Sequence, residues 1–149
     1  MSRNNIAVVF ATCFVLTLSY AASTTGFAST KRELPARLDR SLDRTTANGS
    51  FHVKIASLSD PIPLHKIHQW SVQVTDRAGF PVPGASFKVG GGMPQHGHGL
   101  PTAPNVQPTG PAGAYALSGM KFSMDGWWEL KLDIAAAGVT DRVTFNIVL

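Results

Sequence analysis

Residues 126–134, Gly-Trp-Trp-Glu-Leu-Lys-Leu-Asp-Ile, indicate the fold class of this chain. From Trp128 to Ile134 every even-numbered residue is apolar, and the odd-numbered residues between them are charged. Side chains alternate between the two faces of a β-strand, so this period of two predicts a strand with one face in a core and the other in solvent.

The period of two recurs through the chain after Gly49. It is found in residues 51–55, 68–74, 85–89, 115–117 and 143–149, which are separated by segments rich in Gly, Pro and Asp. About seven short strands with turns between them are typical of an immunoglobulin-like sandwich. We therefore expect an all-β fold, an antiparallel β-sandwich that occupies residues 49–149.

The apolar positions change phase around Gly119. They are odd-numbered in residues 115–117 and even-numbered in residues 120–124. One extra residue in the strand, a β-bulge near Gly119, would explain the change. Asp125-Gly126 then reads as a hairpin turn, which predicts that this strand pairs with the strand beginning at Trp127.

Residues 1–28 have the pattern of a secretory signal peptide. A polar start with Arg3 precedes the apolar run 6–22, and small residues allow cleavage after about residue 21 to 28. An uncleaved membrane anchor is the alternative, but the run is shorter than the ~20 residues that a comfortable span needs. We expect cleavage, and therefore a periplasmic or secreted protein.

Cys13, the only cysteine, lies in this apolar run, so cleavage leaves a chain without a thiol. That excludes a thiolate enzyme, a zinc finger and a redox motif. Nucleophile elbows, phosphate-binding loops and metalloprotease motifs are also absent from the sequence, and we expect no enzyme.

The positive charge of the chain is concentrated before the domain. Five of the 13 Lys and Arg residues lie in residues 29–48, which we interpret as a basic tether, whereas residues 49–149 are nearly neutral. A nucleic-acid-binding domain usually carries its basic residues on the folded module. The distribution therefore argues against nucleic acid as a partner.

Residues 90–101, Gly-Gly-Gly-Met-Pro-Gln-His-Gly-His-Gly-Leu-Pro, gather metal-ligand side chains in one loop. His96 and His98 would point to the same side of an extended segment, ~6–7 Å apart, and could converge on one ion. Met93 adds a thioether. Imidazole and thioether without cysteine favour copper. A flexible polar loop that carries histidines by chance is the alternative.

Met120 and Met124 are further candidate ligands. They alternate with Phe122 along one strand face, and ordinary core packing is the alternative, the more so for Met124. If the predicted hairpin lies beside the loop, Met120 is the better placed of the two. We interpret the remaining histidines, His52, His65 and His68, as ordinary surface or partly packed residues.

Trp127 suggests a different kind of binding site. In a regular strand Trp128 would face the core, which leaves Trp127 on the polar face. An exposed indole can stack on a sugar or on a protein partner, or it can lie across a neighbouring side chain.

The chain from Trp70 onward resembles the FixH/YtkA-like family of small exported Ig-like proteins. The resemblance covers more than half of the chain. It runs through residues 74–85 (Val-Thr-Asp-Arg-Ala-Gly-Phe-Pro-Val-Pro-Gly-Ala), 92–99 (Gly-Met-Pro-Gln-His-Gly-His-Gly), 113–115, 119–130 (Gly-Met-Lys-Phe-Ser-Met-Asp-Gly-Trp-Trp-Glu-Leu) and 141–145. The Met-Pro-x-His-Gly-His-Gly loop joined to Gly-Met-x-Phe-x-Met is its most specific part.

The resemblance implies an exported β-sandwich that, in some members, is linked to copper supply for membrane oxidases. Carried over to this chain, it implies Met93, His96, His98 and Met120 as copper ligands, with Met124 as an additional one. The best-known FixH proteins keep a membrane anchor, whereas this N-terminus has a cleavable pattern.

Two functions follow as hypotheses. The first is an exported metal-binding protein, a copper carrier or accessory factor that uses the His/Met loop and works with a membrane or periplasmic protein. The second is an Ig-like interaction module without metal, which would bind a protein or glycan through the same loop and Trp127.

Overall fold

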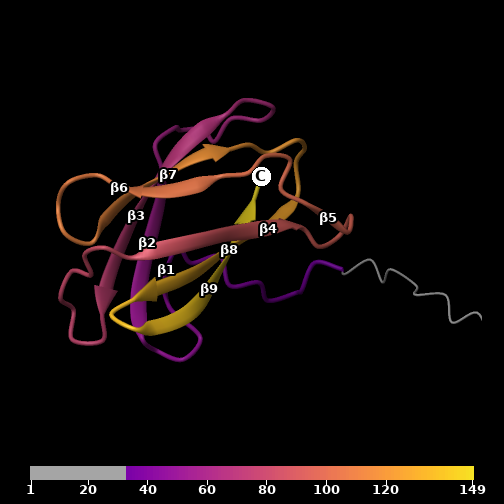
Figure 1. Ribbon diagram of the computed structural model, residues 1–149. Helices are drawn as coiled ribbons and strands as arrows, with labels where there is room; N and C mark the ends of the chain where they lie inside the picture. The colour runs from indigo at the N-terminus through magenta and orange to yellow at the C-terminus, as the bar shows by residue number, and fades with distance from the viewer. Residues whose placement is uncertain (1–32) are drawn as a thin grey trace, which may run out of the picture.

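Alternating apolar residues build two antiparallel sheets that pack face to face in residues 33–149, the part of the chain that this computed structural model describes (Figure 1). The predicted signal peptide lies outside these residues. The nine described strands are β1 (Asp43–Thr45), β2 (Phe51–Ser57), β3 (His68–Asp76), β4 (Ser86–Met93), β5 (His98–Gly99), β6 (Asn105–Pro108), β7 (Ala114–Met120), β8 (Trp127–Ala136) and β9 (Val139–Val148).

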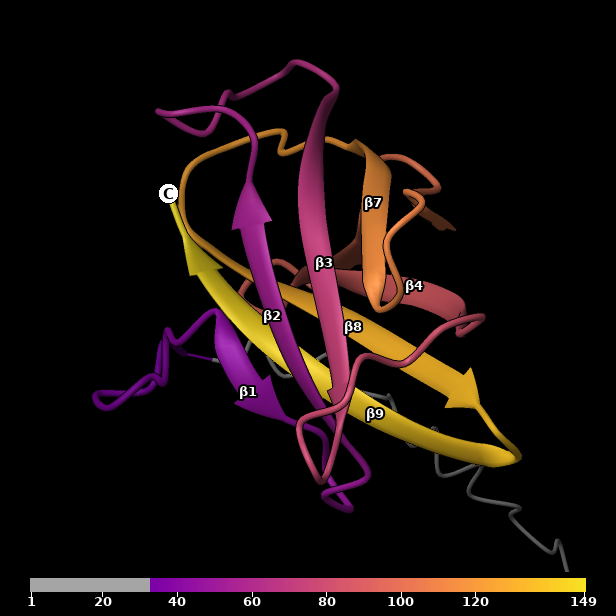
Figure 2. The ribbon, with the colours of Figure 1, turned by 90° about the vertical axis from the view of Figure 1, so that its left-hand side faces the viewer.

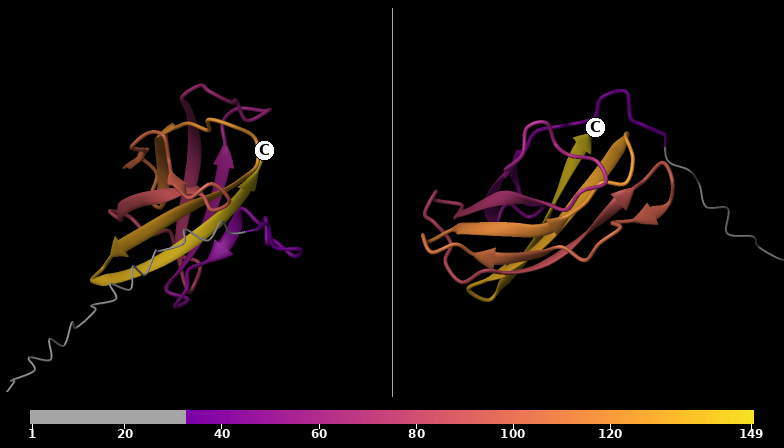
Figure 3. Two further views of the ribbon diagram at one scale, coloured as in Figure 1. Left: turned by 90° about the vertical axis from the view of Figure 1, so that its right-hand side faces the viewer. Right: turned by 90° about the horizontal axis from the view of Figure 1, so that it is seen from above.

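One sheet has the strand order β1-β2-β3-β7-β6 and the other β5-β4-β8-β9. Figure 2 looks through β2 and β3 onto β8 and β9, and Figure 3 shows β8 and β9 in front from the opposite side. The inward side chains form one core, in which Trp70, Trp128, Phe122 and Phe145 are the largest fully buried residues. The predicted all-β sandwich is confirmed, and the short strands β1, β5 and β6 are the ones that the alternation of apolar residues did not predict.

The predicted β-bulge near Gly119 is confirmed. In the pairing of β3 with β7, His68 lies opposite Met120 but Trp70 lies opposite Leu117, so β7 holds one residue more than β3 between these pairs. Gly119 adopts a φ of 83°, which favours glycine. Because of this extra residue, both Leu117 and Met120 face the core.

The predicted hairpin at Asp125-Gly126 is wrong. β7 pairs with β3 and β6, whereas β8 pairs with β4 and β9, so the connection between β7 and β8 crosses from one sheet to the other. Phe122 in this connection is fully buried, so the connection packs against the core as it passes from one sheet to the other. Gly126 instead exchanges two backbone hydrogen bonds with Leu149, of 3.1 and 3.2 Å.

Part of the predicted tether belongs to the sandwich. Residues 43–45 form β1, which pairs with β2, and the Thr46 side chain is buried. Thr46 Oγ1 donates a 2.7 Å hydrogen bond to Asp141 Oδ2, and the backbone N–H groups of Asn48 and Ser50 also donate to this carboxylate. The folded unit therefore begins before Gly49.

Asp141 should make stability depend on pH. Burial raises its pKa, but the hydrogen bonds from Thr46, Arg142, Asn48 and Ser50 outweigh burial and hold the pKa well below its usual range. A carboxylate with a depressed folded pKa stabilises the fold above its unfolded pKa of ~3.9, and this contribution is lost as the pH falls below that value.

We expect Asp141→Asn to lower the melting temperature at pH 7 by several degrees and to reduce the loss of stability on acidification. Thermal unfolding at pH 7 and pH 3 measures both effects. Asp125→Asn, at an exposed carboxylate, is the control and should change neither. Equal acid sensitivity of the wild type and Asp141→Asn would contradict this role.

Candidate metal-binding hairpin

The predicted His/Met loop is a tight hairpin at one end of the sheet that contains β4. β4 pairs with the two-residue strand β5, with Gly92 opposite Gly99 and Met93 opposite His98 (Figure 1). The Met93 carbonyl accepts hydrogen bonds from the backbone N–H groups of His96 and Gly97, at 3.1 and 3.0 Å. These bonds close the turn, so both imidazoles are carried by an ordered backbone.

Two glycines allow the strands to approach at this hairpin. A Cβ on Gly92 would lie 2.1 Å from the His98 carbonyl oxygen, and a Cβ on Gly91 would lie 2.0 Å from the Glu129 carbonyl oxygen. Both glycines also have a positive φ, of 152° and 138°. Gly91 and Gly92 are therefore needed for β8 and β5, respectively, to pack against β4.

His96 and His98 lie together on the exposed side of the hairpin. Their ring centroids are 5.9 Å apart and their planes differ by 29°, a stacked arrangement. His98 Nδ1 lies 3.2 Å from the Gly99 carbonyl oxygen. A carbonyl can only accept, so Nδ1 donates its hydrogen, and the lone pair of the neutral ring is on Nε2.

Met93 and Trp128 lie beneath the two imidazoles. Met93 is only 1% exposed and is the cross-strand partner of His98, which places their Cβ atoms about 4.5–5.5 Å apart. The Met93 methyl group lies 2.9 Å from the position that a Gly126 Cβ would take. The Trp128 ring meets the His98 ring edge-on at 5.9 Å. The hairpin thus places both Met93 and His96 next to His98.

Met120 lies in the other sheet. It is 0% exposed and is the cross-strand partner of His68 in β3. The chain that leaves the hairpin approaches it, because Thr102 Oγ1 donates a 2.6 Å hydrogen bond to the carbonyl of Gly119. The structure therefore pairs Met120 with His68, although the sequence grouped it with the loop.

Met124 lies in the connection between β7 and β8, with 39% of its surface exposed. Its carbonyl accepts a 3.1 Å hydrogen bond from Trp128 Nε1, the indole that packs against His98. The structure thus ties the backbone of Met124 to the support of the hairpin.

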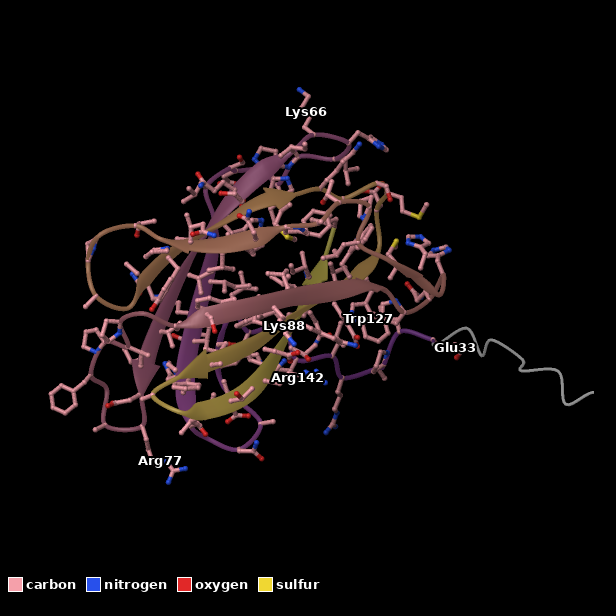
Figure 4. All side chains as sticks on the ribbon, viewed as in Figure 1. Glu33, Lys66, Arg77, Lys88, Trp127 and Arg142 are labelled. Atoms are coloured by element: carbon pink, nitrogen blue, oxygen red, sulfur yellow. The ribbon has the colours of Figure 1, made fainter. Side chains whose placement is uncertain are left out.

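The predicted exposure of Trp127 is wrong. This residue is 2% exposed, and its Nε1 donates a 3.0 Å hydrogen bond to Asn146 Oδ1. Figure 4 shows Trp127 beside the N-terminal segment that follows Glu33, and Pro35 and Leu38 line the same shallow groove as Trp127. The N-terminal residues therefore cover the face on which Trp127 was expected to meet solvent.

An open hollow of about 310 Å³ lies next to the hairpin. Glu129, the partner of Gly92 in β8, is buried at this hollow and pairs with Lys131, with 2.8 Å between Oε2 and Nζ. The sequence pattern placed Glu129 on a solvated face and gave no sign that this residue is buried. The absent side chains of the glycines in β4 were the signal that another strand packs closely there.

Within residues 33–149, no group of three or more His, Cys, Asp or Glu side chains is arranged to hold a metal ion. The same residues contain no helix long and apolar enough to span a bilayer.

Comparison with known proteins supports the predicted resemblance. No curated protein matches the chain. The fold is similar to the crystal structure of a DUF4426 family protein from Pseudomonas aeruginosa PAO1, with a TM-score of 0.50 and 17% identity over 68% of this chain and 91% of that one. The YtkA-like family model matches residues 47–133, more than half of the chain, and the chain therefore belongs to the YtkA-like family.

Proposed function

We propose that this protein is an exported copper-binding carrier or accessory protein that holds the ion at the β4–β5 hairpin. The observation that carries the proposal is the pairing of Met93 with His98 and the stacking of His96 on His98. Two imidazoles and one thioether thus meet at one ordered turn. Thioethers favour Cu(I) and imidazole accepts both oxidation states, so the donor set fits copper.

The three side chains have different roles in this proposal. His98 offers the Nε2 lone pair, because its Nδ1 is held by the Gly99 carbonyl. His96 is exposed and stacks on His98, so a small ring rotation would direct a second nitrogen to the same ion. Met93 supplies a sulfur from below. Two exposed ligands above one buried ligand suit an ion that must be taken up and released.

Met120 and Met124 stay predictions as ligands of this site, because Met120 lies opposite His68 in the other sheet and Met124 lies in the connection between β7 and β8. Export also stays part of the proposal, because the signal pattern lies before residue 33. The alternative, an interaction module without metal, loses its aromatic anchor, because Trp127 is buried under the N-terminal segment. It then depends on the hairpin alone.

Copper titration of the purified protein and of His96→Ala/His98→Ala tests the proposal. We expect the double variant to bind Cu(II) at least about tenfold more weakly, a loss of ~1.4 kcal/mol or more. Because imidazole must be deprotonated to bind a metal, wild-type binding should also weaken as the solution is acidified. Competition with a chromophoric chelator gives both affinities.

His52→Ala is the matched control. His52 is an exposed histidine that pairs with Asp43 on the sheet of β2, on a different sheet from the hairpin. Its removal should leave copper affinity unchanged. Equal copper affinity in the wild type and the double variant would refute the hairpin site and leave the interaction module as the better hypothesis.

A further inference from the structure

His68 lies inside the sandwich with one ring nitrogen fixed. It is 8% exposed, at the start of β3, and its Nδ1 is 3.1 Å from the Lys66 carbonyl oxygen. Since that oxygen can only accept, Nδ1 carries the hydrogen. The neutral ring then has its lone pair on Nε2, at the far side of the ring from the Lys66 backbone.

His68 Nε2 is buried and has no hydrogen-bond partner among residues 33–149. The rings around it are those of Phe122, with centroids 5.3 Å apart, and Trp70, at 6.4 Å. A buried acceptor without a partner costs free energy that a leucine at this position would not cost. In this orientation the imidazole would be stabilised by a partner at Nε2, either a hydrogen-bond donor or a metal ion.

Met120 is the side chain placed opposite His68 on the same inner face. As direct cross-strand partners, the two residues have Cβ atoms about 4.5–5.5 Å apart. The unbranched methionine side chain has three rotatable bonds and can bring its sulfur to a neighbouring group. The thioether side chain of Met120 and the imidazole of His68 thus belong to neighbouring, buried residues.

The bulge in β7 is what directs Met120 inward. Without the extra residue at Ser118-Gly119, the alternation from Leu117 would place residue 120 on the outer face. Two hydrogen bonds hold the bulge, from Gln69 Nε2 to Ser118 Oγ at 2.8 Å and from Thr102 Oγ1 to the Gly119 carbonyl. Bulges of this kind often re-aim a side chain at a functional site.

We propose that His68 Nε2 and the Met120 thioether form a second, interior site for Cu(I), separate from the hairpin. One imidazole and one thioether in an apolar pocket suit a soft monovalent ion of low coordination number, and they disfavour harder divalent ions. The interior site uses none of Met93, His96 and His98. It can therefore be present even if the hairpin does not bind copper.

The competing explanation is an internal water molecule. Trp70 Nε1 is also buried without a partner, and a water could accept from this indole and donate to His68 Nε2. The two explanations make different predictions for the Met120 sulfur. A metal site needs this sulfur as a ligand, whereas a water bridge needs only His68 and Trp70.

The test is a titration of purified His96→Ala/His98→Ala protein with Ag(I), a diamagnetic substitute for Cu(I), followed by NMR of the methionine methyl groups and histidine nitrogens. We expect one equivalent to shift the Met120 methyl carbon and His68 Nε2 in parallel. Adding Met120→Leu, which conserves the side-chain volume, or His68→Phe should abolish the shift at the remaining partner. Adding His52→Ala, at an exposed histidine of β2, should leave both shifts intact.

Parallel Cu(I) titrations against a chromophoric chelator should show the same loss of one equivalent with Met120→Leu. Unchanged signals of Met120 and His68 on Ag(I) addition would overturn the interior site, and so would a His68 shift that persists in Met120→Leu. Failure of the hairpin proposal is a separate result, because it is measured as the difference between the wild type and His96→Ala/His98→Ala.

Discussion

Gly92→Ala is expected to detach the hairpin from the sandwich and to abolish tight copper binding. Its Cβ would lie 2.1 Å from the His98 carbonyl oxygen and 2.7 Å from the Gly99 Cα, both backbone atoms that cannot rotate away. The positive φ of Gly92 adds strain for any other residue. Strain and overpacking each cost ~1–3 kcal/mol, so we expect a destabilisation of roughly 2–6 kcal/mol.

Gly90→Ala, two residues earlier in β4, is the matched control. A Cβ at Gly90 meets no atom within 4 Å, and the substitution should leave both stability and copper affinity near the wild-type values. Chemical denaturation gives the free energies of unfolding, and the copper titration described above gives the affinities. Similar values for Gly92→Ala and Gly90→Ala would show that the close approach of β5 is not needed.

Trp128→Ala should cause the largest loss of stability in the core near the site. Trp128 is fully buried, packs against Phe122 with ring centroids 5.2 Å apart, and also contacts His98. Truncation of a buried aromatic residue to alanine costs about 3–5 kcal/mol. The change also removes the donor to the Met124 carbonyl, so the connection between β7 and β8 should loosen.

Trp128→Phe separates packing from the indole hydrogen bond, because it keeps an aromatic ring but lacks the N–H group. We expect its free energy of unfolding, measured by urea denaturation, to lie between those of the wild type and Trp128→Ala. We also expect copper affinity to fall in Trp128→Ala even under conditions where the protein remains folded, since His98 loses the ring that orients it. A loss of less than 1 kcal/mol in Trp128→Ala would contradict the packing that we describe.

The alternation of apolar residues was enough to predict the sandwich, and the change of phase at Gly119 was enough to predict the bulge. Both are local patterns that a strand imposes on its own sequence. The pairing of strands is different, because Asp125-Gly126 is a valid turn signal that does not determine which sheet receives the next strand. The burial of Phe122 determined that the chain crosses the core there.

The same distinction applies to the candidate site. Met93, His96 and His98 were predicted together because they are close in sequence and on one turn. His68 and Met120 are about 50 residues apart, and only the register of β3 with β7 brings them together. Trp127 was misplaced because residues beyond its own strand cover it, as when Asn146 Nδ2 donates to the Asp39 carbonyl, 107 positions away in sequence.

The unequal burial of the three methionines in residues 33–149 also ranks them by their susceptibility to oxidation. Oxidants reach an exposed thioether first and convert it to a polar sulfoxide, which is a poor ligand for a soft metal. Met124 is 39% exposed, whereas Met93 and Met120 are almost completely buried. Peroxide should therefore consume Met124 long before it reaches the two buried sulfurs, and the capacity to bind soft metals should outlast the first oxidative damage to the protein.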